Sequence, residues 1–290
     1  MVPLSDREEI QKNKRSDAAA RYPDLIRKVI SEWSSSEEGD MVWLMYSANY
    51  LLRTDGIRWA IDPVFMNWRV PETPPVDHAS LAEKLEFVLL THNHADHLDF
   101  DLLRTLRNHP ITWVVPEAMQ AVVVEKGGIL KKQILNPVHM KTMVIKDIQI
   151  TPFESLHCEP PLPGESEPHG VPEIGYLVEF NGKRWLFPGD IRDYRAYLLP
   201  KFGEIDVLFA HLWLGRKCAL LEYPPFVKEF CQFCADLEPK KVTLAHLDEY
   251  GRPADNLWDD HHAGLVISKF SQTAPGIPMD LFHTGERVSI

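Results

Sequence analysis

The 290-residue sequence lacks any uninterrupted apolar run of about 20 residues, the length that a membrane-spanning helix needs. Its N-terminal stretch is polar and lacks the apolar core of a secretory signal peptide. These absences argue against an integral membrane protein and against secretion. We therefore expect a cytoplasmic location.

Cysteine is also scarce, with only Cys158, Cys218, Cys231 and Cys234 in the chain. Reduced thiols are the usual state in the cytosol, so these residues do not indicate a disulfide framework. Cys231 and Cys234 form a C-x-x-C pair, but no second pair exists and residues 226–237 have helical periodicity. We predict two neighbours on a helix; a redox or zinc role is the alternative.

Basic residues are outnumbered, with 31 Lys and Arg against 42 Asp and Glu, which gives a formal net charge of −11. An acidic surface repels phosphate backbones and anionic membranes. The balance therefore disfavours nucleic-acid binding and leaves a small-molecule substrate, including a small anion drawn to a metal.

Residues 1–40 are charged and helical in pattern, and residues 41–290 carry the remaining elements. Apolar residues recur from Leu25 to Trp33, which predicts an amphipathic helix. We expect this N-terminal helical extension to dock on the body of the protein. Docking on a second subunit, which would give a homo-oligomer, is the alternative.

Strands and helices alternate along the main segment, which predicts a layered α/β protein. A strand over Met41–Leu52 and another over Ile57–Ile61 form a hairpin through a turn at Asp55-Gly56. Further strands are predicted at 112–115, 143–150, 175–180, 184–187, 207–210 and 242–245, and helices at 98–107, 116–126 and 226–237.

The sequence His92-Asn-His94-Ala-Asp96-His97 follows the apolar run 87–90 and precedes a helix that begins after Asp99. Imidazole and carboxylate are the ligands that suit Zn²⁺ and similar divalent metals. In an open α/β sheet, sites lie at the carboxyl ends of strands. This segment therefore predicts a metal site; a histidine-rich surface loop is the alternative.

Three further residues with metal-binding side chains end predicted strands: His157, Asp190 and His246. Together with the first four they make seven candidates, too many for one tetrahedral ion. Such a set suits two ions about 3.5–4 Å apart that share a carboxylate and a water. Two cations lower the pKa of that water toward neutrality and supply hydroxide.

These motifs resemble those of the metallo-β-lactamase-fold hydrolases, over roughly residues 41–290. The branch most similar contains the ascorbate-6-phosphate lactonases and the N-acyl-phosphatidylethanolamine-hydrolysing phospholipase D. The resemblance rests on the hairpin that ends at Asp62, the histidine cluster followed by Leu98-Asp99, the pair Gly189-Asp190, and the closing strand at residues 284–288.

The resemblance implies a four-layer αββα sandwich of two similar halves. It implies that one metal is held by His92, His94 and His157 and the other by Asp96, His97 and His246, with Asp190 between them. Asp62 would orient the ligand loop. Asp96 and Asp190 are the implied catalytic carboxylates. Zinc is the expected metal, with manganese or iron as alternatives.

The chain departs from the family pattern at Tyr46-Ser47, where Gly-His is common, and at Leu247-Asp248, where Tyr-Gly is common. The segment between His157 and Gly175 is unusually rich in proline. These differences fall near the expected substrate site. They bear on the identity of the substrate more than on the metal ligands.

Several other polar residues have two interpretations. His283 also follows a strand-like run and competes with His246, which we prefer because it precedes the closing strand. His211 lines the pocket or belongs to the core, and residues 259–262 form a solvated face or a substrate loop. Arg216-Lys217 hold an anion or are surface residues, and His169 is a substrate contact or exposed.

Residues 159–173 form the longest irregular stretch and follow the candidate ligand His157 directly. Prolines limit its conformations, which suits a semi-rigid wall. We predict that it borders the metal cleft and shapes substrate choice.

The leading interpretation is a dinuclear metal-dependent hydrolase whose metal-bridging hydroxide attacks an ester, lactone or phosphodiester. A phosphodiesterase or nuclease of the same fold is one alternative. A di-iron redox protein and a non-catalytic scaffold are alternatives of other classes.

Overall fold

The computed structural model describes residues 4–36, 39–159 and 169–290, and it contains two seven-stranded sheets. The first has the order β14-β1-β2-β3-β4-β5-β6 and the second the order β13-β12-β11-β10-β9-β8-β7. Their strands are β1 Met41–Leu44, β2 Tyr50–Thr54, β3 Ile57–Ile61, β4 Phe87–Leu89, β5 Thr112–Val114, β6 Ile134–Leu135 and β14 Arg287–Ser289 in the first sheet, and β7 Met143–Ile145, β8 Ile148–Glu154, β9 Ile174–Phe180, β10 Lys183–Phe187, β11 Val207–His211, β12 Val242–Ala245 and β13 Met279–Leu281 in the second.

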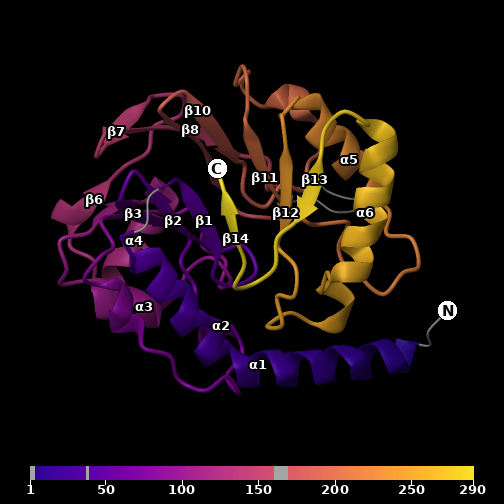
Figure 1. Cartoon of the computed structure of the whole chain (residues 1–290), viewed down its shortest axis with the longest axis horizontal. Coiled ribbons are helices and arrows are strands. Elements are labelled where there is room, and N and C mark those ends of the chain that lie inside the picture. Colours follow the sequence, from indigo (N-terminus) through magenta and orange to yellow (C-terminus); the bar gives the residue numbers. More distant parts are fainter. Residues whose placement is uncertain (1–3, 37–38, 160–168) are drawn as a thin grey trace.

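Helices cover the outer faces of both sheets (Figure 1). The α-helices are α1 Leu4–Ser34, α2 Met66–Arg69, α3 Phe100–Leu106, α4 Glu117–Glu125, α5 Val227–Asp236 and α6 Asp260–Thr273. Short 3₁₀ helices lie at His78–Leu81, Lys131–Gln133, Ala196–Leu198 and Ala254–Asn256. The helices α1, α3 and α4 pack on the first sheet, and α5 and α6 pack on the second. The predicted αββα sandwich with an N-terminal helix is confirmed.

The strand sequences explain why the sheets have two buried faces. Along β2, Tyr50 and Leu52 lie in the core between the two sheets, whereas Leu51 lies in the core under the helices. Side chains alternate between the faces of a strand, so a strand covered on both faces buries every position and is mostly apolar, with Arg53 and Thr54 the buried polar residues of β2. All five residues of β2 are buried.

The long helix α1 docks on the body of the protein, as expected. Tyr22, Ile26, Val29 and Trp33 are buried in the same core as Trp43 of β1. The indole Nε1 of Trp33 donates a hydrogen bond to the Leu52 carbonyl oxygen at 2.8 Å. The division of the chain at residue 40 stays a prediction. Within the described residues, no helix combines the length and apolarity that crossing a membrane requires.

Two predicted strands are wrong in the same way, because each is a hairpin of two strands. Residues 41–52 form β1 and β2, joined by a loop in which the Met45 amide donates to the Asn49 carbonyl oxygen. Residues 143–150 form β7 and the start of β8, with Lys146 and Asp147 at positive φ angles of 51° and 68°. Two left-handed residues between paired strands make the tight turn whose twist suits a hairpin. Neither turn contains the glycine that would have revealed it.

Candidate metal centre

The four candidates in residues 92–97 lie on the loop between β4 and α3, at the carboxyl end of a central strand. The loop is fixed at its far end by Asp99, whose side chain accepts a hydrogen bond from the Leu102 amide and caps α3. A carboxylate at this position satisfies a free helix N–H group. Rigid elements on both sides therefore position the ligand loop.

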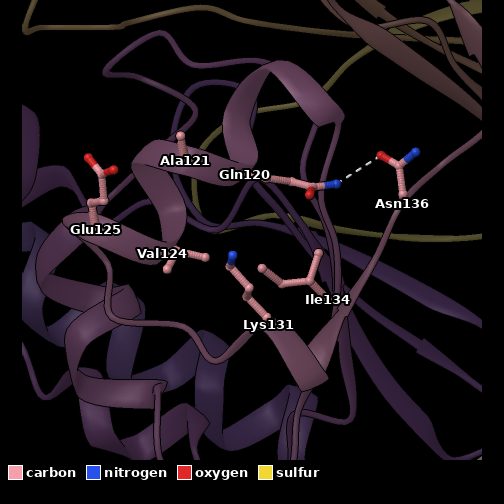
Figure 2. A pocket seen from close by; sticks show the side chains of 7 residues that line it. All are labelled: Gln120, Ala121, Val124, Glu125, Lys131, Ile134 and Asn136. Atoms are coloured by element: carbon pink, nitrogen blue, oxygen red, sulfur yellow. Dashed lines mark hydrogen bonds between the residues drawn. The ribbon is translucent and has the colours of Figure 1, made fainter.

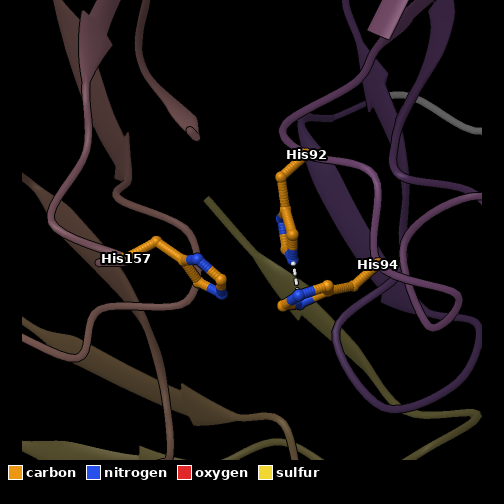
Figure 3. Close-up of side chains that lie close together, drawn as sticks. All are labelled: His92, His94 and His157. Carbon is orange, nitrogen blue, oxygen red and sulfur yellow. Dashed lines mark hydrogen bonds between the residues drawn. The ribbon is translucent and has the colours of Figure 1, made fainter. Parts of the chain in front are cut away.

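The structure brings all seven predicted residues together in two groups. His92, His94 and His157 form one group, and Asp96, His97, Asp190 and His246 form the other; the ligand atoms within each group lie within 4.8 Å of one another. Figure 3 shows that the rings of His92, His94 and His157 point toward one another, with His157 approaching from the opposite side. His157 follows β8 of the second sheet, so loops at the ends of strands from both sheets contribute to the site.

Four of the imidazole rings make a polar contact through their Nδ1 atom. His92 Nδ1 contacts Glu173 Oε1 at 2.9 Å, His97 Nδ1 contacts Asp62 Oδ2 at 2.8 Å, and His246 Nδ1 contacts the Leu212 carbonyl oxygen at 3.2 Å. His157 Nδ1 lies 3.1 Å from both the carbonyl oxygen and the amide nitrogen of Val171. The tautomer that donates to the carbonyl leaves a lone pair on Nε2, which is the arrangement that metal-binding histidines use.

The Nε2 atoms of His97 and His157 provide a test of whether this set fits a metal. Both are buried without a hydrogen-bond partner among the described residues, although His97 Nε2 lies 3.4 Å from Asp190 Oδ1. A buried polar atom without a partner costs free energy, about 1–3 kcal/mol. A divalent cation would bind such a lone pair, so the donor set fits the group that the fold family implies.

Burial also keeps most of these rings neutral, which is the form that binds metal. It lowers the pKa of His157 to about 3 and that of His246 to about 4, and it lowers the pKa of His92 well below the usual value. His97 behaves oppositely. Burial alone would lower its pKa, but the carboxylates of Asp190 and Asp62 hold it well above the usual value. Those carboxylates favour positive charge at this position, whether a proton or a metal.

The carboxyl groups of Asp96 and Asp190 are ionised in this setting. Burial opposes ionisation, but Arg252 and His246 hold the pKa of Asp96 well below its usual range. The neighbouring His246 and His97 do the same for Asp190. Ionised carboxylates beside neutral imidazoles are the donor set of a divalent metal site.

His211 contacts the candidate ligand Asp190 through its side chain. Its Nδ1 donates to Asp190 Oδ1 at 2.9 Å, and its Nε2 accepts a hydrogen bond from the Tyr50 hydroxyl at 2.8 Å. Both nitrogens are engaged and the ring is buried. His211 therefore orients a candidate ligand and is not itself a ligand.

Two residues that no sequence motif indicated, Glu173 and Arg252, also contact the candidate ligands. Glu173 is buried; its Oε1 lies 2.9 Å from His92 Nδ1 and accepts a hydrogen bond from the Asp190 amide at 3.0 Å, and burial raises its pKa to about 7. A Cβ at Gly189, whose φ is +81°, would lie 2.4 Å from Glu173 Oε1. Glycine therefore precedes Asp190 because Glu173 needs the space. No local signal identifies Glu173, since it occurs within the irregular stretch.

Arg252 lies inside the second group. Its Nη2 hydrogen-bonds to Asp96 Oδ2, lies 3.0 Å from His246 Nε2 and lies 3.8 Å from Asp190 Oδ2. The side chain is 15% exposed. Its position 156 residues along the chain from Asp96 explains why the sequence alone did not indicate it.

The other weighed residues lie outside the two groups. His283 is 39% exposed and pairs with Asp260 and Glu286. Asp259 caps α6, and His262 is buried with Nε2 donating to the Ala219 carbonyl oxygen at 2.6 Å. The interpretation of residues 259–262 as a solvated face or substrate loop is therefore wrong for His262, because the helix turns that ring inward.

Cys231 and Cys234 are buried neighbours on α5 and belong to none of the candidate metal groups found in the described residues. The prediction of two helix neighbours is confirmed. Burial raises the pKa of Cys231 to about 12, which keeps its thiol protonated at neutral pH.

Both described ends of the irregular stretch adjoin the candidate centre; residues 160–168 lie outside the described residues. The Glu159 amide donates to the His169 carbonyl oxygen at 2.7 Å, and Val171 contacts His157. These contacts agree with a stretch that borders the cleft. Its effect on substrate choice stays a prediction.

A cavity of about 360 Å³ opens over the candidate centre, with His94 and Asp96 in its wall together with Arg192, Arg216 and Arg252. A different hollow of about 480 Å³ lies beside α4 and is lined by residues such as Gln120, Lys131 and Asn136 (Figure 2). It contains no candidate ligand, so the cavity over the histidines is the candidate substrate site.

Comparison with known proteins agrees with this geometry. The family model described as "Beta-lactamase superfamily domain" matches residues 58–247. A 3-hydroxylase of 4-amino-L-phenylalanyl-peptidyl-carrier-protein from Streptomyces venezuelae is 29% identical over 181 residues, which cover 61% of this chain and 30% of that protein.

The mitochondrial N-acyl-phosphatidylethanolamine-hydrolysing phospholipase D of Saccharomyces cerevisiae is 29% identical over 246 residues, covering 78% of this chain and 48% of that protein. This chain therefore spans less than half the length of either of these two curated relatives. The solved structure of a metallo-hydrolase from Ignicoccus hospitalis has a TM-score of 0.61 and 17% identity, and covers 87% of this chain and 98% of that one. At that identity the likeness concerns the fold.

Proposed function

The chain belongs to the metallo-β-lactamase-fold superfamily, and on that premise we propose that it is a dinuclear metal-dependent hydrolase. We propose as substrates small-molecule esters, lactones or phosphodiesters, with Zn²⁺ as the metal and the cytoplasm as the location. The observation that carries the proposal is the convergence of two groups of ligand side chains, with a buried His157 Nε2 that has no hydrogen-bond partner among the described residues.

In this proposal His92, His94 and His157 hold one ion, and Asp96, His97 and His246 hold the other, with Asp190 shared. When bound, two divalent ions supply a water of lowered pKa and Lewis acidity at the electrophilic oxygen. The residues around the candidate ligands would hold those ligands in position. Glu173 fixes His92, Asp62 fixes His97 and His211 fixes Asp190.

The test is elemental analysis of protein purified without chelator, together with hydrolysis of p-nitrophenyl acetate, a homoserine lactone and bis-p-nitrophenyl phosphate. We expect about two divalent ions per chain and turnover of at least one substrate class. His94→Ala and Asp190→Ala should lose one or both ions and the activity. His261→Ala, which removes an exposed histidine outside both groups, is the matched control. Less than half an ion per chain in the wild-type protein, after metal has been supplied in excess, contradicts the proposal.

A second candidate function is iron-dependent oxygen chemistry, which the similarity to the Streptomyces 3-hydroxylase and to the solved structure of a diiron β-hydroxylase from the same species favours. Histidine and carboxylate ligands accept iron as well as zinc. The dependence of turnover on iron, oxygen and a reductant distinguishes the two candidate functions. A hydrolase loaded with Zn²⁺ turns over its substrate without oxygen, whereas an oxygenase requires iron, oxygen and a reductant.

A further inference from the structure

The cavity over the candidate centre is basic in a chain whose net charge is −11. Arg192, Arg216 and Arg252 line it, and Glu159 and Asp96 are the acidic residues among its lining. Asp96 is already bonded to Arg252 and faces His246 at 3.4 Å. The outer part of the cavity therefore presents two guanidinium groups, those of Arg192 and Arg216, to one carboxylate.

These two arginines already hold an oxyanion. Arg192 Nη1 donates to Glu159 Oε1 at 3.1 Å, and Arg216 Nη2 donates to the same oxygen at 2.8 Å. The Glu159 and Arg192 side chains are only 12% and 14% exposed, so this contact is partly shielded from water. Charge-assisted hydrogen bonds from arginine to carboxylate or phosphate are strong and directional.

The Arg192 side chain also packs against an aromatic ring. Its guanidinium lies 5.6 Å from the centre of the Trp213 ring, and its Nε is buried with no hydrogen-bond partner among the described residues. Stacking on an aromatic face holds a guanidinium in one plane. Arg192 therefore keeps its position when the carboxylate between the two arginines is exchanged for another anion.

An apolar cavity of about 580 Å³ adjoins the basic one and shares four of its lining residues, Glu159, Arg192, Trp213 and Arg216. Its apolar side is formed by Tyr194, Pro225 and Phe226, and its remaining lining residues are Asp193, Arg195, Gly215, Cys218, Glu229 and Gln232. The rings of Trp213 and Phe226 stack with centres 5.6 Å apart. Cavities with apolar walls and a few convergent polar groups are typical of small-molecule sites.

We propose that Arg192 and Arg216 form an oxyanion clamp for a substrate that carries a carboxylate or phosphate beside an aryl or alkyl group. The anion takes the place of the Glu159 carboxylate, and the apolar group lies against Trp213 and Phe226. The clamp and the residues His94 and Asp96 line one cavity, so the scissile bond lies between the anion and the candidate centre. That such a substrate is hydrolysed rests on the proposed function, whereas the binding of its anionic group by Arg192 and Arg216 does not.

The binding test uses phenylphosphonate and benzoate as anionic probes and benzyl alcohol as the neutral probe, titrated by calorimetry into the full metal-loaded chain. Arg192→Gln/Arg216→Gln should weaken both anions about tenfold or more, because two charge-assisted hydrogen bonds are lost. Glu159→Gln should do the opposite and tighten them about threefold or more, because the competing carboxylate is gone. The neutral probe should change in neither variant.

Arg104→Gln, which removes an exposed arginine paired with Asp101 on α3, is the matched control and should bind like the wild type. If the double variant fails to fold, Arg216→Gln alone, whose side chain is 38% exposed, gives the same comparison. Unchanged anion affinity in the double variant overturns the clamp, since the probe then sits on the metals. Unchanged or weaker anion binding in Glu159→Gln also overturns it.

A hydrolysis assay separates failure of the clamp from failure of the proposed function. The double variant should lose about tenfold in kcat/KM for mono-p-nitrophenyl succinate but keep its rate on neutral p-nitrophenyl acetate and its metal content. Equal losses on both esters overturn the clamp and leave the hydrolase intact. A chain that binds the anions as expected but hydrolyses neither ester retains the clamp and removes the proposed function.

Discussion

Replacing Arg252 by glutamine should strengthen the binding of the second divalent ion. His246 Nδ1 contacts the Leu212 carbonyl oxygen, so the lone pair on Nε2 is the one available to a metal. Arg252 Nη2 lies 3.0 Å from that Nε2 and also bonds to Asp96 Oδ2. An orienting residue would contact the remote nitrogen, as Asp62 does for His97. The guanidinium instead lies in the direction that a metal would take.

The magnitude follows from what a metal must displace. A hydrogen bond to a charged group contributes about 1.5–3 kcal/mol, and about 1.4 kcal/mol corresponds to a factor of ten in affinity. Binding at the second group should therefore tighten by about 10- to 100-fold in Arg252→Gln. Within the described residues, Arg252 makes no hydrogen bond or ion pair with His92, His94 or His157, so the first group should be unaffected.

The assay is a Zn²⁺ titration of chelator-treated, dialysed protein against a competing fluorescent chelator. The wild type should show one tight and one weaker ion, and the variant should show two ions of more similar affinity. Arg69→Gln is the control. This variant removes a different arginine, which bonds to Glu249 at 3.1 and 3.3 Å. Within the described structure, Arg69 bonds to none of the candidate ligands. If the second ion binds Arg252→Gln no more tightly than the wild type, the guanidinium orients Asp96 and the reasoning is refuted.

Three other changes test the site and the fold. Asp62→Asn should weaken zinc binding by about 10- to 100-fold, because the carboxylate that holds the ligand loop is lost; the same chelator competition measures it, and wild-type affinity would contradict the assignment. Substituting His246 by alanine should empty one metal position, whereas substituting His283, which is 39% exposed, should leave the metal content intact, as elemental analysis would show. Trp33→Ala should lower the free energy of unfolding by about 3–5 kcal/mol in a denaturant titration, because a fully buried indole is removed. Ile10→Ala, at a 47% exposed position, should have little effect, and equal losses would mean that the docking of α1 contributes nothing.

Much of the fold was predictable because its signals are local. Helical periodicity identified α1, α3, α4 and α5 to within a few residues, and short apolar runs identified β4, β9 and β12. The two missed hairpins have turns without glycine. Lys146 and Asp147 both adopt left-handed conformations; aspartate tolerates this region, but lysine has little preference for it, so strand pairing imposes it there. A pattern of apolar residues does not show where such a chain reverses.

The preference for His246 over His283 was made from the order of motifs, and the structure places His246, but not His283, in a candidate metal group of the described residues. His246 follows β12, which lies one strand nearer the middle of its sheet than β13. The His246 amide donates to the Ser47 carbonyl oxygen at 2.8 Å, and its Nε2 lies 3.4 Å from Asp96 Oδ2 of the ligand loop. His283 follows the edge strand β13 and faces Asp260 at the start of α6. Strand order within a sheet is a non-local property that the sequence does not display.

The sequence by itself determined the chemistry of the site, because ligand types and strand ends are local features of the chain. The cluster from His92 to His97, and the residues Asp190 and His246, were identified in this way. Only the tertiary structure decided which nitrogen of each ring faces the centre and which residues orient it. Glu173 and Arg252 reach the ligands from loops 81 and 156 residues away along the chain, through contacts that exist only once the two sheets have packed together.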